Sequence, residues 1–260
     1  MTLQRSSTEL LCYLTHKFNR NLNMNSTKYQ PQTINEVVFG NDESRQLIED
    51  IASGLLPFPF EGKTGILLYG TFGTGKTTLA RLLPEAIERG QTGEDLAIPA
   101  EFFGCQQGQV GTAFTAMVEK HTSKTSLNTS GRHYFIFDEV DSLSKAAQAG
   151  MKTTLNSPRS VFILTTNNIS QLDKGVKDRC VLVEMNAAID AEYLPLARRI
   201  AADEDVVLSD AQLLTAIAGN GGSFRSVIFS VLRLALRTAR HSATAAKTAA
   251  AVIQQAANKL

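Results

Sequence analysis

A glycine-rich segment that contains one lysine carries the clearest chemistry in the sequence. Residues 70–78 read Gly-Thr-Phe-Gly-Thr-Gly-Lys-Thr-Thr, which matches the phosphate-binding pattern G-x-x-x-x-G-K-[ST], the P-loop. In this pattern the glycines let backbone N–H groups turn towards a phosphate, the lysine reaches the β- and γ-phosphates, and the next hydroxyl ligates Mg²⁺. We therefore expect Lys76 and Thr77 to hold ATP or GTP together with Mg²⁺. The expected nucleotide-binding residues of the loop are Gly70, Thr71, Phe72, Gly73, Thr74, Gly75, Lys76, Thr77 and Thr78.

The segments on both sides of this loop are the elements that such a site needs. Residues 66–69 are a short apolar run typical of a buried strand, and residues 77–83 have the composition of a helix. A helix that starts at the loop adds positive potential for the phosphates. A glycine-rich turn without a ligand is the alternative, and a strand–loop–helix context disfavours it.

Two acids follow a second apolar strand and indicate what the nucleotide is for. Residues 133–137 are apolar and aromatic, and Asp138-Glu139 come directly after them. An acid at the carboxyl end of a buried parallel strand lies where ligands bind in an open α/β sheet. Asp138 is placed to organise Mg²⁺, and Glu139 to position or activate an attacking water. The pair favours hydrolysis over transfer to a small molecule, and a solvated strand end is the alternative.

A third strand is predicted over residues 161–164, and two amides lie shortly after it. The sequence Thr165-Thr166-Asn167-Asn168 ends this strand. Alone, two adjacent asparagines indicate a turn. After the other two motifs, an amide at this strand end indicates a sensor that hydrogen-bonds the γ-phosphate or the attacking water.

Taken together, these motifs resemble the AAA+ ATPases, and in particular clamp-loader subunits of the replication factor C and phage types. Residues 27–34 resemble that family's K-Y-R-P-x-T-[LI] opening, and residues 37–40 resemble its adenine-side box. Residues 138–143 with Ala147-Gln148 resemble D-E-A-D-S-[LM]-x-x-x-A-Q. Asn167 resembles the first sensor. Asp178-Arg179-Cys180 resembles the S-R-C finger motif, and residues 222–225 resemble the second sensor, G-D-x-R.

The resemblance implies a role for each matched residue. Val37, Val38 and Gly40 would lie beside the adenine. Asn167 would orient water, Arg179 would reach the ATP of the neighbouring subunit, and Arg225 would report the γ-phosphate to the lid. The catalytic set that it implies is Lys76, Asp138, Glu139, Asn167, Arg179 and Arg225, with Thr77 and Asp138 as metal ligands. It also implies other AAA+ subunits, DNA and a sliding clamp or other ring protein as partners.

Four positions depart from the family pattern. Gln30 replaces an arginine, and Ser223 replaces an aspartate before Arg225. Asp178 replaces a serine, so we expect a local ion pair that restrains Arg179. Gly150 falls inside an expected helix, where glycine costs about 1 kcal/mol relative to alanine. The family's helical collar domain has no match, because only residues 241–260 follow the last expected lid helix.

The expected fold is α/β, a P-loop NTPase core with a five-stranded parallel sheet and helices on both faces, followed by a small helical lid. The expected strands are 66–69, 101–105, 134–137, 161–164 and 181–184, with a loop over 123–131. The expected sections are an N-terminal extension (1–27, with Met24 as an alternative start), the core (28–186), the lid (187–240) and an Ala-rich basic terminal helix (241–260).

Composition indicates a soluble protein of the cytoplasm. Among the 260 residues no apolar run approaches a membrane span, and residues 1–30 lack the apolar core of a signal peptide. The three cysteines form no C-x-x-C pair, so we interpret them as reduced thiols and expect no zinc site.

Charge is distributed unevenly along the chain. The net charge is +1, yet no acid follows Asp210 while six basic residues do. Arg233, Arg237 and Arg240 recur at helical spacing and therefore share one face. This face is either simply solvated or a docking surface for an acidic partner or DNA phosphates. Lys145 and Lys152 lie nearest to the helix positions with which clamp loaders grip DNA.

Two other functions remain open at this stage. One is a helicase loader or transposition-type ATPase that binds single-stranded DNA. The other is a nucleotide-gated adaptor of a defence or regulatory complex, which binds ATP as a switch and hardly hydrolyses it.

Overall fold

The computed structural model describes residues 28–105 and 111–257. The described residues from 31 to 257 belong to one compact unit, and the contacts discussed below lie within it. The predicted N-terminal extension, residues 1–27, lies outside the described residues. None of the described helices is long and apolar enough to cross a membrane.

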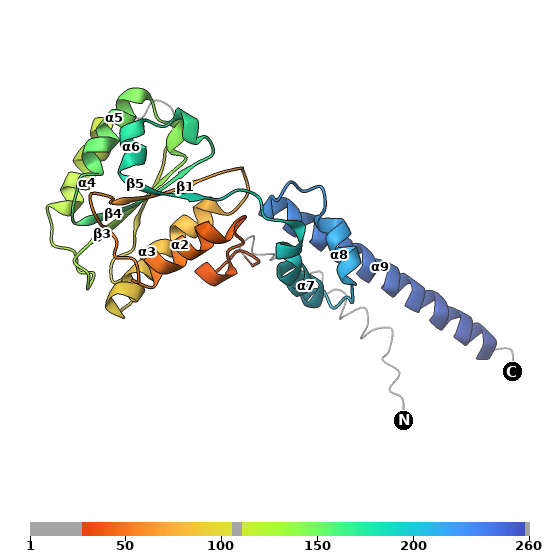
Figure 1. Ribbon diagram of the computed structural model, residues 1–260. Helices are drawn as coiled ribbons and strands as arrows, with labels where there is room; N and C mark the ends of the chain where they lie inside the picture. Colours follow the sequence, from red (N-terminus) through yellow and green to blue (C-terminus); the bar gives the residue numbers. More distant parts are fainter. Residues whose placement is uncertain (1–27, 106–110, 258–260) are drawn as a thin grey trace. The chain divides into compact units, whose positions relative to one another are not determined.

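A five-stranded parallel sheet forms the centre of this unit, as the sequence predicted (Figure 1). The strand order is β2-β3-β4-β1-β5, so β4 lies between the strand that precedes the P-loop and the strand that ends in the two acids. All carboxyl ends of parallel strands meet at one edge, where ligands bind in such sheets. The strands are β1 (Gly65–Tyr69), β2 (Glu101–Gly104), β3 (His133–Asp138), β4 (Ser160–Thr166) and β5 (Cys180–Glu184).

Helices cover both faces of the sheet. The helices of the core are α2 (Asp42–Ala52), α3 (Lys76–Thr92), α4 (Gly111–Thr122), α5 (Lys145–Thr154) and α6 (Lys174–Asp178). Figure 1 shows α2 and α3 on one face and α4, α5 and α6 on the other. Short 3₁₀ helices are Ile34–Glu36, Val140–Ser142, Ile169–Gln171 and Asp190–Tyr193.

The side chains of the strands divide into two hydrophobic cores because successive residues point to opposite faces. Ile66 and Leu68 of β1 pack towards α2 and α3, whereas Leu67 packs towards α4, α5 and α6. Each of these three side chains is fully buried, which stabilises the fold by about 1.5–3 kcal/mol per side chain. The two cores hold the sheet against both helix layers and thereby fix the edge that carries the site.

The helix that starts at the P-loop is anchored near its carboxyl end. The Glu88 carboxylate of α3 is fully buried and accepts hydrogen bonds from the Ser130 backbone N–H (2.8 Å), the Ser130 hydroxyl (2.6 Å) and the Tyr134 hydroxyl (2.8 Å). Burial, followed by the bond to Glu88, raises the pKa of Tyr134. This network joins α3 to β3 and to the loop over residues 123–131, which the sequence predicted.

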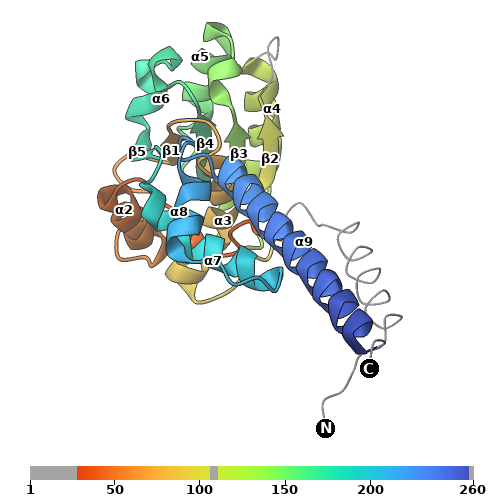
Figure 2. The ribbon, with the colours of Figure 1, turned by 90° about the vertical axis from the view of Figure 1, so that its right-hand side faces the viewer.

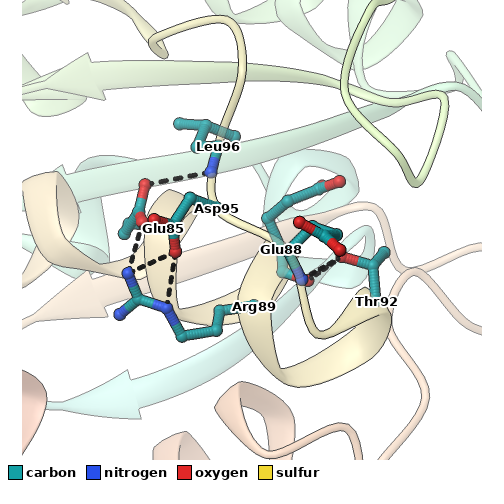
Figure 3. A network of polar contacts seen from close by, with 7 residues as sticks. Glu85, Glu88, Arg89, Thr92, Asp95 and Leu96 are labelled. Carbon is teal, nitrogen blue, oxygen red and sulfur yellow. Dashed lines mark hydrogen bonds and ion pairs between the residues drawn. The ribbon is translucent and has the colours of Figure 1, made fainter.

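The last turns of α3 are also tied to the segment that follows the helix (Figure 3). Arg89 pairs with Glu85 one turn earlier (2.8 Å) and with Asp95 after the helix (2.6 Å). The Leu96 N–H donates to Glu85 at 3.2 Å. Since these groups are largely exposed, the ion pairs contribute little on their own, but they fix where the chain leaves α3.

Three helices, α7 (Leu194–Asp203), α8 (Asp210–Ile217) and α9 (Phe224–Ala257), follow the sheet. Both α7 and α8 pack on α9 (Figures 1 and 2). The buried face of α9 contains Val227, Val231 and Ala235, spaced by one helical turn. Ile228, Leu234 and Leu236, which lie beside this face, are only partly buried.

The expectation of a separate Ala-rich helix after residue 240 is wrong. Helix α9 continues without a break to Ala257 over 34 residues. No glycine or proline lies between its ends, and alanine has the highest helix propensity. Nothing in the local sequence therefore ends the helix at the predicted boundary.

Candidate nucleotide-binding and hydrolysis site

The P-loop lies directly after β1, and its glycines are required for two different reasons. Gly70, Gly73 and Gly75 have φ of 147°, 79° and 97°, which side chains rarely adopt. A Cβ at Gly70 would lie 2.5 Å from the Met185 carbonyl oxygen, and one at Gly73 would lie 2.4 Å from the Ser223 hydroxyl. A Cβ at Gly75 would meet nothing within 4 Å. Glycine is therefore needed at position 75 only for its positive φ. At positions 70 and 73 it is also needed because a side chain would clash with neighbouring atoms.

Lys76 lies inside the loop, and its ammonium forms no ion pair with another described residue. Its ammonium donates to the carbonyl oxygens of Gly70 (3.0 Å) and Thr71 (2.6 Å), and the residue is 6% exposed. Burial lowers the pKa of Lys76, and the nearby acids Asp141 and Asp138 oppose this shift. A buried ammonium whose hydrogen-bond partners among the described residues are two neutral carbonyls favours an anionic ligand, which fits the phosphates of a nucleotide.

Thr77 and Asp138 meet, as the sequence predicted for the metal site. The Thr77 hydroxyl donates to Asp138 Oδ1 at 2.8 Å, across 61 positions of the chain. A hydroxyl and a carboxylate are the hard oxygen ligands that Mg²⁺ prefers. Asp141 Oδ1, close by, is buried without a hydrogen-bond partner among the described residues. These oxygens fit a bound divalent cation.

Glu139 adopts a left-handed backbone conformation, with φ 59° and ψ 50°. A non-glycine residue in this region is uncommon and is found preferentially at functional sites. Its N–H donates to the Thr165 hydroxyl at 2.9 Å, and its side chain is exposed. The Glu139 side chain is therefore accessible to water at the end of β3.

The two amides after β4 have different surroundings. Asn168 Oδ1 accepts from the Ser170 N–H (3.2 Å) and the Ser170 hydroxyl (2.6 Å), so it caps the following 3₁₀ helix. The partly buried side chain of Asn167 makes no hydrogen bond to another described residue. Since β4 lies between β1 and β3, Asn167 emerges between the P-loop and Asp138. Of the two amides, Asn167 is the one free to bind a ligand.

The segment before α9 contacts the P-loop directly. The Phe224 N–H donates to the Gly73 carbonyl at 2.9 Å, and the Ser223 side chain lies over Gly73. The Ser223 hydroxyl also accepts from the Ser226 N–H (3.4 Å), as in an N-cap. Ser223 thus accepts the hydrogen bond that an N-cap residue accepts, although it stands where the family pattern has an aspartate. Arg225 follows, exposed, and its charge contributes to the lowered pKa of Lys76.

Asn186 was missed from the sequence and connects the loops around the site. Its Oδ1 accepts from the Thr71 N–H at 3.3 Å, and its amide donates to Glu184. A Cβ at Gly40 would lie 2.5 Å from the Asn186 carbonyl oxygen. The predicted adenine-side segment therefore does reach the P-loop, by way of Asn186, although no motif pointed to this residue.

The other two members of that segment differ in burial. The Val37 side chain is 4% exposed and belongs to the core on the side of α2 and α3. Val38 is partly exposed. Their contact with adenine remains a prediction.

Arg179 does not lie at the P-loop of its own chain. Its carbonyl oxygen accepts from the N–H groups of Thr64 and Gly65, both at 3.1 Å, at the start of β1. The P-loop begins at the other end of this five-residue strand, roughly 13 Å away. The guanidinium donates to Asn156 Oδ1 (2.8 Å) and to the Gly175 carbonyl (2.9 Å).

The expected ion pair between Asp178 and Arg179 does not form. The carboxylate of Asp178 is exposed, and Arg179 turns back to the α6 carbonyl of Gly175 and to Asn156 instead. The interactions of Arg179 with Asn156 could not be read from the sequence, because 23 positions separate the two residues.

The predicted DNA-facing and docking residues differ in their partners and exposure. Lys152 pairs with Asp173 at 3.3 Å, whereas Lys145 is exposed. Arg233, Arg237 and Arg240 lie on α9 beside Phe229, Leu232 and Leu236. A role for either group of residues in binding DNA or a partner stays a prediction.

Comparisons with known proteins give the family that the core resembles. Residues 66–186 match the family described as "ATPase family associated with various cellular activities (AAA)". The chain is similar to the replication factor C large subunit of Methanosarcina mazei, with 28% identity over 212 residues. It is also similar to the replication factor C small subunit 2 of Pyrobaculum islandicum (26% identity) and the replication factor C subunit 4 of Caenorhabditis elegans (26%).

These matches cover 77%, 81% and 80% of this chain but only 32%, 63% and 61% of the three relatives. The chain thus spans between about one third and two thirds of their length. Among solved structures, a point mutant of Thermotoga maritima RuvB matches with a TM-score of 0.60 at 19% identity. The match covers 85% of this chain and 68% of that one, and it supports the fold. Residues 66–186 are therefore similar to the AAA ATPase family, the core has the AAA+ fold, and the sequence is similar to those of replication factor C subunits.

Proposed function

We propose that this chain hydrolyses ATP and works as a clamp-loader-like subunit that remodels a ring protein on DNA. The observation that carries the proposal is the convergence of Lys76, the Thr77–Asp138 pair and Glu139 at one edge of the sheet. The names of the similar replication factor C subunits support a role in replication.

Each residue has a distinct task in this proposal. When ATP binds, the Lys76 ammonium gives up its hydrogen bonds to the two loop carbonyls and contacts the β- and γ-phosphates instead. Thr77 and Asp138 hold Mg²⁺, which when bound neutralises charge on the phosphate oxygens. Glu139 takes a proton from water as the water oxygen attacks the γ-phosphorus and the bond from that phosphorus to the β,γ-bridging oxygen breaks. The products are ADP and phosphate.

Asn167 and the two arginines complete the site. Asn167 orients the attacking water, and Arg225 contacts the γ-phosphate from the start of α9. Because Ser223 and Phe224 already contact Gly73, a change at the γ-phosphate would be transmitted to the lid helices. Arg179 points away from its own P-loop, so it would act on the ATP of the next subunit and require an oligomer.

Steady-state ATPase assays test the proposal with two variants. Lys76→Ala should abolish nucleotide binding, since the charge that faces the phosphates is lost. Glu139→Gln should bind ATP normally but turn it over more slowly by on the order of 10²–10⁴. Equal turnover in Glu139→Gln and the unmodified protein would exclude the assigned role.

The same assay distinguishes the output. Rates are compared without DNA, with single strands, with a primed template, and with a primed template plus a sliding clamp. The clamp-loader-like proposal expects the largest stimulation in the last condition. Stimulation by single strands alone would favour a helicase loader, and tight ATP binding with negligible turnover in all four conditions would favour a nucleotide-gated adaptor.

A further inference from the structure

One hydroxyl at the site has no place in the motifs that the sequence carries. Thr165 is the second-last residue of β4 and is 2% exposed. Its Oγ1 lies 2.6 Å from Asp138 Oδ1 and 2.9 Å from the Glu139 backbone nitrogen. The backbone N–H can only donate, so the hydroxyl accepts from Glu139 and gives its own proton to the Asp138 carboxylate. Both neighbours thereby fix the orientation of the hydroxyl.

We propose that Thr165 is a positioning residue that holds the metal-binding acid and the water-activating acid in one fixed arrangement. This inference rests on the proposed hydrolysis. Thr165 is too deeply buried to contact nucleotide or water, so it acts through Asp138 and Glu139. The substrate it serves is the Mg²⁺ complex of a nucleoside triphosphate.

The bond to Glu139 explains how a disfavoured backbone conformation is kept. Glu139 has φ 59°, where a residue with a Cβ is rarely found. The peptide N–H of the same residue is anchored by the Thr165 hydroxyl. Without this anchor, the Glu139 backbone would be free to relax to a common conformation and carry its carboxylate away from the sheet edge.

The bond to Asp138 persists when the site is filled. Asp138 Oδ1 accepts from two hydroxyls, those of Thr77 (2.8 Å) and Thr165 (2.6 Å). Thr77 is itself expected to bind the metal, and that role competes with its bond to Asp138. Thr165 is then the hydroxyl that continues to orient the carboxylate, as outer-shell partners of metal ligands do.

The position of Thr165 also links the acids to the sensor. Asn167 lies two residues further along, where the chain leaves β4. A displacement of Asn167 by a bound γ-phosphate would therefore act on the strand end that holds Asp138 and Glu139. The Thr165 hydroxyl thus connects the strand that carries Asn167 to both Asp138 and Glu139 through hydrogen bonds.

The test compares variants that differ only in this hydroxyl. Thr165→Val keeps the shape of the side chain and removes both hydrogen bonds, whereas Thr165→Ser keeps the hydroxyl. Thr154→Val is the matched control, because Thr154 is also buried (4% exposed) and its hydroxyl is also bonded, to the Gly150 carbonyl, away from the acids. Thr165→Ala is made as a second variant, in case the Thr165→Val protein does not fold. Thermal melting verifies folding.

Two readouts are measured on each variant. One is kcat and KM for ATP. The other is the Mg²⁺ concentration that gives half-maximal binding of a fluorescent ADP, which is independent of turnover. Thr165→Val should lower kcat and raise the Mg²⁺ concentration needed for half-maximal ADP binding, each by about 10–100-fold. The binding of ADP in the absence of Mg²⁺ should stay unchanged. Thr165→Ser should restore both, and Thr154→Val should change neither.

The outcomes separate this inference from the proposed function. If the unmodified protein shows no turnover, the proposed hydrolysis fails, and the Mg²⁺ dependence of ADP binding still decides the role of Thr165. A folded Thr165→Val or Thr165→Ala protein whose Mg²⁺ dependence and kcat stay within twofold of the unmodified values would overturn the inference. An equal loss in Thr154→Val would also overturn it, since the effect would then be structural.

Discussion

The contact between the lid segment and the P-loop can be tested with a pair of glycine substitutions. Gly73 and Gly93 have the same φ, 79°. A Cβ at Gly73 would lie 2.4 Å from the Ser223 hydroxyl, whereas a Cβ at Gly93 would meet nothing within 4 Å. Gly73→Ala and Gly93→Ala therefore both place an alanine at a left-handed φ, and only Gly73→Ala displaces Ser223.

The expected magnitudes follow from this difference. A left-handed conformation costs about 1–2 kcal/mol for an alanine, and both variants bear this cost. Overpacking against Ser223 adds about 1–3 kcal/mol in Gly73→Ala. For a domain of this size, that excess lowers the melting temperature by a further 2–4 °C or so per kcal/mol. The displacement also breaks the bond from the Phe224 N–H to the Gly73 carbonyl.

Thermal melting of the ligand-free proteins measures the effect. Gly73→Ala should melt below Gly93→Ala, and Ser223→Gly in the Gly73→Ala background should recover most of the difference by removing the atoms that clash. Identical melting temperatures of Gly73→Ala and Gly93→Ala would refute the reasoning, because they would mean that Ser223 does not rest on the P-loop.

Two further predictions concern ionisable groups. Burial raises the pKa of the Cys105 and Cys180 thiols to about 12. Neither thiol should therefore react with a thiol reagent at pH 8 until the protein is denatured. Rapid labelling of Cys105 or Cys180 in the native protein, located by mass spectrometry, would contradict this. The pKa of Lys76 is lowered below its usual 10.5, so the ligand-free lysine loses its proton at a lower pH than in an unfolded chain. The affinity for an ATP analogue, measured by fluorescence titration, should therefore be constant near neutral pH and fall before pH 10.5 is reached; constant affinity up to that pH would contradict the prediction.

The sequence was sufficient for the parts of the fold that local patterns determine. All five strands lie within one or two residues of their predicted bounds, because apolar runs between helices are strong signals for a parallel sheet. Thr77 and Asp138 meet as predicted, since strand ends in a parallel sheet meet at one edge. The predicted break in α9 failed because composition changes near residue 240 while helix propensity does not.

What the sequence could not provide are contacts between distant residues. Thr165 and Asn186 act through hydrogen bonds to residues far away in the chain, such as Glu139, 26 positions from Thr165, and Thr71, 115 positions from Asn186. No spacing rule predicts such bonds, since they depend on strand order and on where a loop ends. The restraint on Arg179 was predicted from its neighbour Asp178, whereas the partner is Asn156, which lies after α5. Sequence adjacency favoured the wrong residue.

The central claim is that Arg179 serves the ATP of a neighbouring subunit, and a mixing experiment tests it most directly. Arg179→Ala should bind ATP but lose activity, since such an arginine is worth on the order of 10³ or more in rate, and Lys76→Ala should be inactive because it cannot bind. Mixing them creates interfaces in which an intact P-loop faces an intact Arg179. The mixture should therefore hydrolyse ATP although neither variant does. If mixed oligomers form, as native mass spectrometry would detect, and no activity returns, then Arg179 does not act on a neighbouring site.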